Sequence, residues 1–137
     1  PARAVDGRGE IDVVECYGHW TDRFSSVLHV HFNDQTQHRT QGTRTSVPDS
    51  SLVDQFNTYG VDISPSAIVL FLNGEEVWRQ PTPSELRYPM YPIINLALGS
   101  GWPIDETPDP SLMYVDYVRV YARGDNDSCA PGLPVER

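Results

Sequence analysis

Short runs of apolar residues, separated by turn-forming residues, dominate the pattern of hydrophobic and polar positions along the chain. Prolines and glycines interrupt the sequence roughly every 8–12 residues, and the runs between them are rich in Val, Ile, Tyr and Phe. Helical periodicity is nearly absent. This spacing is typical of a sandwich or barrel of antiparallel strands, so we predict an all-β fold.

The clearest predicted element is a β-hairpin. Its first strand is Ala67–Leu72, the pair Asn73-Gly74 forms a tight turn, and residues 75–79 return. Alternation and β-forming composition predict further strands over residues 10–16, 25–32, 56–63, 91–99 and 113–121. The polar stretch 33–51 lacks periodicity and is expected to be a long loop or weak strands.

Length, charge and the ends of the chain narrow the picture. The length of 137 residues fits one domain, which we place at 1–122, followed by a polar tail or linker at 123–137. A formal net charge of −9 argues against binding nucleic acid and suits a neutral or cationic sugar polymer better. The longest apolar run is too short to cross a bilayer, so no membrane partner is expected. Any export signal is expected to be absent or already removed.

The segment Glu10-Ile11-Asp12-Val13-Val14-Glu15 carries the candidate chemistry. In a regular strand Glu10 and Asp12 share one face, and Glu15 would point to the other face, into the core. A one-residue β-bulge at Val13-Val14 would bring all three carboxylates to one surface. The sequence therefore predicts an irregularity in this strand.

Three carboxylates on one face repel one another, which a purely structural strand would avoid. Glycoside hydrolysis uses such an arrangement, because one carboxylate attacks the sugar and another protonates the leaving oxygen. An exposed acidic strand or a calcium site is the alternative. The six residues by themselves leave these interpretations open.

Four blocks of sequence then carry a resemblance to a known family. Glu10 to Glu15 fits the Glu-x-Asp-x-x-Glu motif of glycoside hydrolase family 16, in its laminarinase-like branch with a bulged motif. Residues 56–65, residues 92–103 and residues 113–121 resemble further blocks of the family in the same order. The resemblance extends from residue 9 to residue 121.

The resemblance implies a concanavalin A-like jelly roll of two antiparallel sheets, with a substrate cleft on the concave face. It implies that Glu10 is the nucleophile, Asp12 its helper and Glu15 the acid/base. It implies no cofactor for catalysis, and a structural calcium held through Asp116, for which a surface carboxylate is the alternative. Family domains are longer and carry the motif near their middle, so the chain resembles the carboxy-terminal part of such a domain.

Other residues are candidates for binding substrate. His29 and His31 alternate with apolar neighbours, so we expect them on the cleft face; two solvent-exposed histidines are the alternative. Asn95 is the polar member of the run 93–98 and is expected to be a buried amide that needs partners. Trp102 follows a glycine-rich loop and could stack on a sugar, or pack in the core. Trp20, just past Glu15, could flank the leaving-group side.

These observations predict an endo-acting, retaining glycoside hydrolase that cleaves β-1,3- or mixed-linked β-glucan and is secreted or periplasmic. The same fold acting on a galactan of the agar or carrageenan type is an alternative. A carbohydrate-binding sandwich without turnover is another. Unpaired strand edges would favour self-association. The sequence leaves open whether Cys16 and Cys129 form a disulfide.

Overall fold

The structure is a computed structural model and describes residues 8–32 and 38–122. The chain divides into two compact units, one on each side of the boundary between Met90 and Tyr91. Every strand of the described residues lies in the first unit. The predicted tail at 123–137 lies outside the described residues. No helix in the described part of the chain is long and apolar enough to span a membrane.

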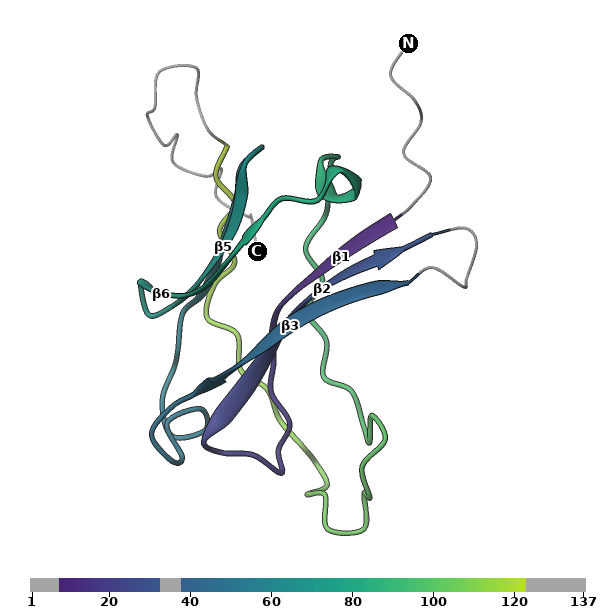
Figure 1. The fold of residues 1–137 in the computed structure, drawn as a ribbon. Coiled ribbons are helices and arrows are strands. Elements are labelled where there is room, and N and C mark those ends of the chain that lie inside the picture. Colours follow the sequence, from purple (N-terminus) through teal and green to yellow (C-terminus); the bar gives the residue numbers. More distant parts are fainter. Residues whose placement is uncertain (1–7, 33–37, 123–137) are drawn as a thin grey trace. The chain divides into compact units, whose positions relative to one another are not determined.

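The first unit contains two antiparallel sheets of three strands each (Figure 1). The first sheet has the order β1-β2-β3 and consists of β1 (Arg8–Glu15), β2 (Arg23–His31) and β3 (Arg39–Ser46). The second has the order β4-β5-β6 and consists of β4 (Tyr59–Ile63), β5 (Ala67–Leu72) and β6 (Glu75–Pro81). A single 3₁₀ turn, η2 (Ser84–Leu86), follows β6. The predicted all-β class is confirmed.

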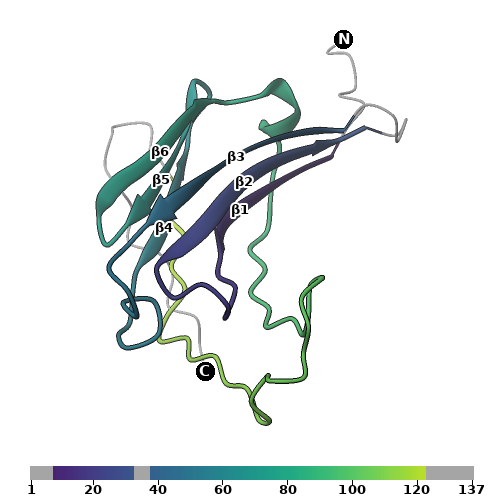
Figure 2. The same cartoon turned by 60° about the horizontal axis from the view of Figure 1, so that its bottom comes forward.

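A small apolar core joins the two sheets, which Figure 2 shows as separate groups of strands. Leu28 of β2 packs with Ile68 and Leu70 of β5 and with Leu86 of η2. Each of these four side chains is at most 3% exposed. Partly buried side chains surround them, namely Ile11, Val13, Val77 and Trp78. The alternating burial of β2 places its other face, with His29 and His31, outside this core.

The outer edge of β1 is fitted closely to the segment after β6. A Cβ atom on Gly9 would lie 1.8 Å from Cδ2 of Leu86, so only glycine allows this approach. The Tyr88 hydroxyl accepts a hydrogen bond from the backbone N–H of Gly9 and donates one to its carbonyl at 3.1 Å. A side chain thus takes the place that a neighbouring strand would occupy at this point of the edge.

The predicted hairpin is confirmed. Asn73 and Gly74 both adopt positive φ angles, 52° and 88°, as a tight turn requires. The Asn73 side chain also accepts a hydrogen bond from the backbone N–H of Thr58 at 2.9 Å, which ties the turn to the start of β4. Within the stretch expected to be a loop or weak strands, β3 is a full strand paired with β2 over eight residues.

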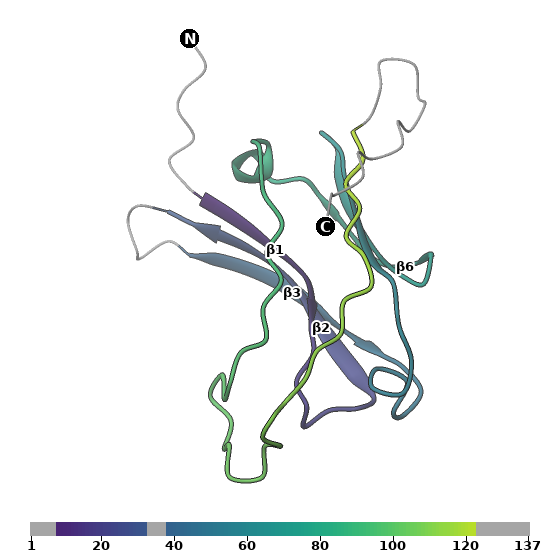
Figure 3. The same ribbon diagram turned by 180° about the vertical axis from the view of Figure 1, so that it is seen from behind.

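Two predicted strands are wrong for this structure. Residues 91–99 and 113–121 have no strand assignment, and the described second unit, residues 91–122, contains no sheet ladder (Figure 3). A β-strand is defined by hydrogen bonds to a neighbour, and no described strand pairs with these segments. Their alternating apolar side chains remain exposed instead, as at Ile93 (70%), Leu98 (67%) and Val120 (67%).

This exposure generates a prediction for the 137-residue chain in solution. Apolar surface of this extent drives association. We expect the chain to self-associate or to melt without cooperativity, as measured by sedimentation velocity and by thermal unfolding. A monodisperse monomer with one sharp unfolding transition would contradict the expectation.

Candidate active site

The strand that carries the three acids contains the predicted bulge. Asp12 pairs with Val27 and Glu15 pairs with Ser25, so three steps along β1 match two steps along β2. Val13 and Val14 therefore stand opposite the single residue Ser26. The extra residue returns Glu15 to the face of Asp12, and this geometric prediction is confirmed.

A buried hydroxyl holds the bulge. Ser26 is fully buried, and its Oγ donates a hydrogen bond to the carbonyl oxygen of Val13 at 2.8 Å. A bulge removes a backbone group from the ladder, and a buried carbonyl without a partner is costly. Ser26 supplies that partner from the core side of β2, so the irregularity is built into the packing.

Registers across the three strands define one face, which we call the acidic face. Directly opposed residues of adjacent strands share a face, so the pairings arrange it in four rows. From one end to the other the rows are Arg8 and His31; Glu10, His29 and Thr40; Asp12, Val27 and Gly42; Glu15, Ser25 and Arg44.

Asp12 is more enclosed than Glu10, the other acid that pairs with a histidine. Its side chain is 22% exposed, and Oδ2 lies 3.1 Å from Nε2 of His29. The other ring nitrogen of His29, Nδ1, lies 3.0 Å from the hydroxyl oxygen of Thr40. A neutral ring can thus donate to Asp12 and accept from Thr40.

The pKa of the Asp12 carboxyl is raised from 3.8 to about 6, and burial is the largest cause. The negative charges of Glu10 and Glu15 and a hydrogen bond with Glu10 contribute to this rise, whereas the charge of His29 opposes it. Asp12 can therefore hold a proton between its neighbours near neutral pH.

Histidines line the Glu10 end of the acidic face. Nε2 of His31 lies 3.5 Å from Oε2 of Glu10, whose side chain is 57% exposed. The rings of His29 and His31 stack with centroids 5.5 Å apart, and His38 meets His31 edge-on at 5.1 Å. Both predicted histidines thus lie beside the acids, on the face where they were expected.

Aromatic side chains and an arginine gather at the Glu15 end. The Tyr17 hydroxyl donates to Oε1 of Glu15 at 3.3 Å, and the Tyr17 ring meets Trp20 edge-on at 5.5 Å. The guanidinium carbon of Arg44 lies 4.5 Å from the centre of the Trp20 ring. An open depression of about 330 Å³ lies here, lined by Glu15, Ser25, Val27, Gly42, Thr43 and Arg44.

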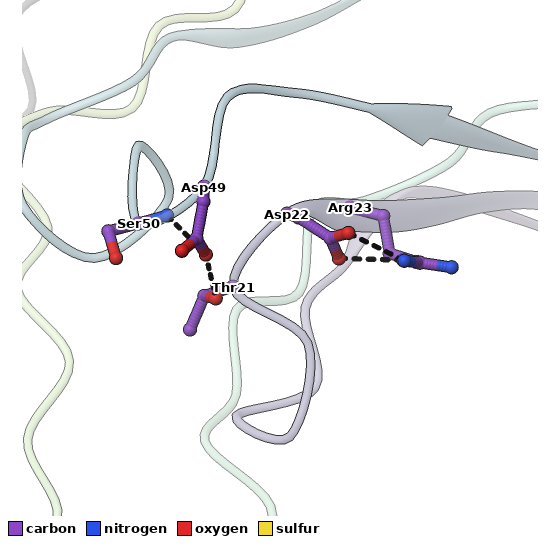
Figure 4. A network of polar contacts seen from close by, with 5 residues as sticks. All are labelled: Thr21, Asp22, Arg23, Asp49 and Ser50. Atoms are coloured by element: carbon purple, nitrogen blue, oxygen red, sulfur yellow. Dashed lines mark hydrogen bonds and ion pairs between the residues drawn. The ribbon is translucent and has the colours of Figure 1, made fainter.

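The loop that carries Tyr17 and Trp20 is anchored to the segment after β3 (Figure 4). Thr21 donates to a carboxylate oxygen of Asp49 at 2.5 Å, and the same oxygen accepts from the backbone N–H of Ser50 at 2.9 Å. Arg23 forms a bidentate salt bridge with Asp22: its Nε donates to Oδ1 at 2.7 Å and its Nη2 donates to Oδ2 at 2.5 Å. These contacts fix the base of the loop beside Glu15.

The other predicted site residues lie in the second unit. Asn95 is exposed, which contradicts the expected buried amide, because the run around it forms no sheet. Trp102 is 40% exposed, so it is not a core residue of the described structure. Asp116 is also exposed, and no group of three or more His, Cys, Asp or Glu in residues 8–32 and 38–122 could hold a metal. Calcium takes six to eight oxygens, backbone carbonyls among them, and its binding through Asp116 stays a prediction.

Sequence reasoning missed Ser26, Thr40 and Arg44. Ser26 had a signal, because it is the polar member of the buried positions of β2, whose others are Phe24, Leu28 and Val30. Thr40 and Arg44 lie in the stretch interpreted as irregular, so only the register of β3 brings them to the acidic face. Cys16 is exposed in the structure, and Cys129 lies outside the described residues.

Comparison with known proteins supports one family. The chain is 36% identical to the endo-1,3-1,4-beta-glycanase ExsH of Rhizobium meliloti (strain 1021), over 82% of this chain and 24% of that protein. It is 27% identical to a beta-glucanase of Rhodothermus marinus, over 82% of this chain and 44% of that one. It is 30% identical to a keratan-sulfate endo-1,4-beta-galactosidase of Sphingobacterium multivorum, over 88% of this chain and 31% of that protein.

No solved structure matches the chain at a significant level. The chain spans about a quarter of the length of the Rhizobium relatives it matches. The profile of the glycosyl hydrolases family 16 matches residues 2–119, which include the bulged strand and the rest of the acidic face. The chain therefore belongs to glycosyl hydrolases family 16.

Proposed function

We propose that the protein is an endo-acting, retaining glycoside hydrolase that cleaves β-glucan, with its catalytic groups on β1. The observation that carries the proposal is the bulge between Asp12 and Glu15, which brings three carboxylates to one face. Mutual repulsion makes such a cluster costly for a structural strand, whereas double displacement at a sugar uses two carboxylates on one face.

Glu10 is the proposed nucleophile. It lies at the end of the three acids and its side chain is the more exposed of the two that pair with histidine, 57% against 22% for Asp12. An accessible carboxylate can approach the anomeric carbon and form the glycosyl-enzyme intermediate. His31, within 3.5 Å, then serves to orient the Glu10 carboxylate.

Glu15 is the proposed acid/base. The bulge places it opposite Ser25 and four residues along β2 from the partner of Glu10, a span of about 13 Å between backbones at 3.3 Å per residue. Two Glu side chains that lean toward each other over a bound sugar close much of this gap. Retaining enzymes bring these carboxyl groups to about 5–5.5 Å.

The substrate proposal rests on the relatives. Two Rhizobium relatives are named endo-1,3-1,4-beta-glycanases and a third relative is named a beta-glucanase. A β-1,3- or mixed-linked β-glucan is therefore the first candidate. The likeness to a keratan-sulfate endo-1,4-beta-galactosidase supports a galactan as the second. Polysaccharides of either kind are degraded outside the cytoplasm, so we propose that the enzyme is secreted or periplasmic.

Counting the reducing ends released from laminarin, lichenan, agarose and keratan sulfate distinguishes the two candidate substrates. Release from laminarin or lichenan supports the β-glucanase, and release from agarose or keratan sulfate alone supports the galactanase. Binding without release from any polymer supports a carbohydrate-binding protein and contradicts the proposed enzyme.

The roles of the two glutamates predict opposite stereochemistry of chemical rescue. Glu10→Ala should abolish polymer hydrolysis, because no other group replaces the nucleophile. With an activated aryl glycoside, azide should then fill the vacated place and give a product of inverted configuration. Glu15→Ala should still form the covalent intermediate from the aryl glycoside, and azide should release it with retained configuration. NMR of the glycosyl azides checks both variants. The reverse pattern would show that the two roles are exchanged.

We expect the substitution Asp12→Asn to change the folding stability in a pH-dependent way and to slow hydrolysis. Because the folded state raises the Asp12 pKa from 3.8 to about 6, the folded protein binds more protons than the unfolded chain in that window. Stability from this group is thus present below pH 3.8 and is lost as the pH rises through 6.

Asn does not ionise, so the variant should gain stability relative to the wild type as the pH rises from about 4 to about 6.5. Urea unfolding at both pH values measures the gain. Activity should fall while configuration at the anomeric carbon stays retained. An equal stability difference at the two pH values would contradict the assigned environment of Asp12.

A further inference from the structure

One chain of contacts on the acidic face connects all three strands of the first sheet. Oδ2 of Asp12 lies 3.1 Å from Nε2 of His29, and Nδ1 of the same ring lies 3.0 Å from Oγ1 of Thr40. A carboxylate of β1 is thus connected through a histidine of β2 to a hydroxyl of β3. The ring joins Thr40 to the middle one of the three acids.

Register and side-chain shape place the Thr40 hydroxyl. Thr40 stands directly opposite His29 in the ladder of β2 and β3, and directly opposed side chains of antiparallel strands are close neighbours on one face. The two heavy atoms on its Cβ restrict rotation about χ1. Threonine therefore presents its hydroxyl to the ring in a better defined direction than a longer polar side chain would.

The sequence neighbours of Thr40 fix β3 at this point. Arg39 pairs with Glu85 of η2, and the side-chain amide of Gln41 donates to the side-chain oxygen of Gln80 on β6 at 2.8 Å. Successive side chains of a strand point to opposite faces, so both contacts lie on the face of β3 away from His29. They join β3 to the second sheet on each side of Thr40, which makes Thr40 a fixed partner for the ring.

A hydroxyl suits this place because it can either donate or accept a hydrogen bond. When Asp12 is ionised, the hydroxyl donates to Nδ1 and the Nε2–H group donates to the carboxylate. When the Asp12 and His29 pair gains a proton, Nδ1 can carry a hydrogen, and the hydroxyl accepts it. The ring keeps both partners in each state, so it does not have to turn when Asp12 gains or loses a proton.

Titratable and charged groups surround Asp12 and His29 on the acidic face. They are Glu10 and Glu15 on β1, Tyr17 just after it, His31 on β2 with His38 beside it, and Arg44 on β3. The two glutamates raise the pKa of Asp12 and His29 lowers it. Loss of the contact with His29 would therefore raise the pKa of Asp12 further.

We infer that Thr40 is a positioning residue for the reaction, which holds the His29 ring so that Nε2 stays on Asp12 in both protonation states of the acid. The inference rests on the proposed function, and it assigns a role to a residue of β3. In this role Thr40 contacts neither the sugar nor a reacting atom. Its loss should slow the chemical step and leave substrate binding unchanged.

The kinetic test compares two substitutions of Thr40 in the full chain. Thr40→Val keeps the shape of the side chain and removes the hydroxyl, whereas Thr40→Ser retains it. On the polymer that the wild type hydrolyses, Thr40→Val should lower kcat about three- to tenfold, the range expected for one hydrogen bond, with KM within about twofold. Thr40→Ser should stay within about twofold of the wild type in both constants.

Thr45→Val is the matched control, because Thr45 lies on the same strand but on its core face, opposite Phe24. It should change neither constant. In a His29→Ala background, Thr40→Val should have no further effect on kcat, since the ring that it positions is absent. An activated aryl glycoside keeps the rates of that background measurable.

Four kinetic results would overturn the inference. They are an unchanged kcat in Thr40→Val, an equal loss in Thr40→Ser, a change confined to KM, and a loss that persists in the His29→Ala background. The third would show that Thr40 contacts the substrate directly. The fourth would show that it acts by a route other than His29.

A titration without substrate separates this inference from the proposed function. NMR of the carboxyl carbons follows the ionisation of Asp12 in the full chain, and Asp12→Asn identifies its signal. Thr40→Val should raise the pKa of Asp12 above the wild-type value, because the contact with His29 that lowers it is weakened, and Thr40→Ser and Thr45→Val should not. If this difference holds in a protein that hydrolyses no polymer, the proposed function alone is refuted. Equal pKa values of Asp12 in the wild type and in Thr40→Val would overturn the inference whatever the activity.

Discussion

The hydrogen bond from the buried Ser26 hydroxyl to the Val13 carbonyl is the interaction on which the site depends. Without the bulge that it stabilises, strict alternation would direct Glu15 to the core face, opposite the buried Phe24. The bond satisfies a carbonyl that the bulge removes from the ladder, and it does so from inside the sheet. The core face of β2 thereby determines what the opposite face presents.

Packing and chemistry therefore share the same three strands. The inward residues of β2 build the core with β5, and its outward residues carry His29 and His31 beside the acids. The close fit of Gly9 against Leu86 fixes the first part of β1, where Glu10 follows. A strand held at both its edge and its bulge can keep like charges together, because moving one acid away would disturb the packing.

The sequence allowed the acidic strand and its irregularity to be predicted, because a Glu three residues after Asp12 conflicts with alternation. It also placed His29 correctly, because β2 alternates without interruption. Residues 91–99 and 113–121 have the same kind of pattern and form no strand, since pairing depends on a neighbour that local sequence does not specify. Arg44 could not be found for a related reason: its position on the acidic face follows from the register of β3 against β2, in a polar stretch without periodicity.

The most direct test of the account is to trap the proposed covalent intermediate. A glycoside with a good leaving group and a fluorine in place of the 2-hydroxyl forms the glycosyl-enzyme faster than water resolves it. Peptide mass mapping should then find the sugar on Glu10, with one label per chain and slow release on dilution. A label on Glu15, or turnover of the polymer without any labelled carboxylate, would contradict the assignment.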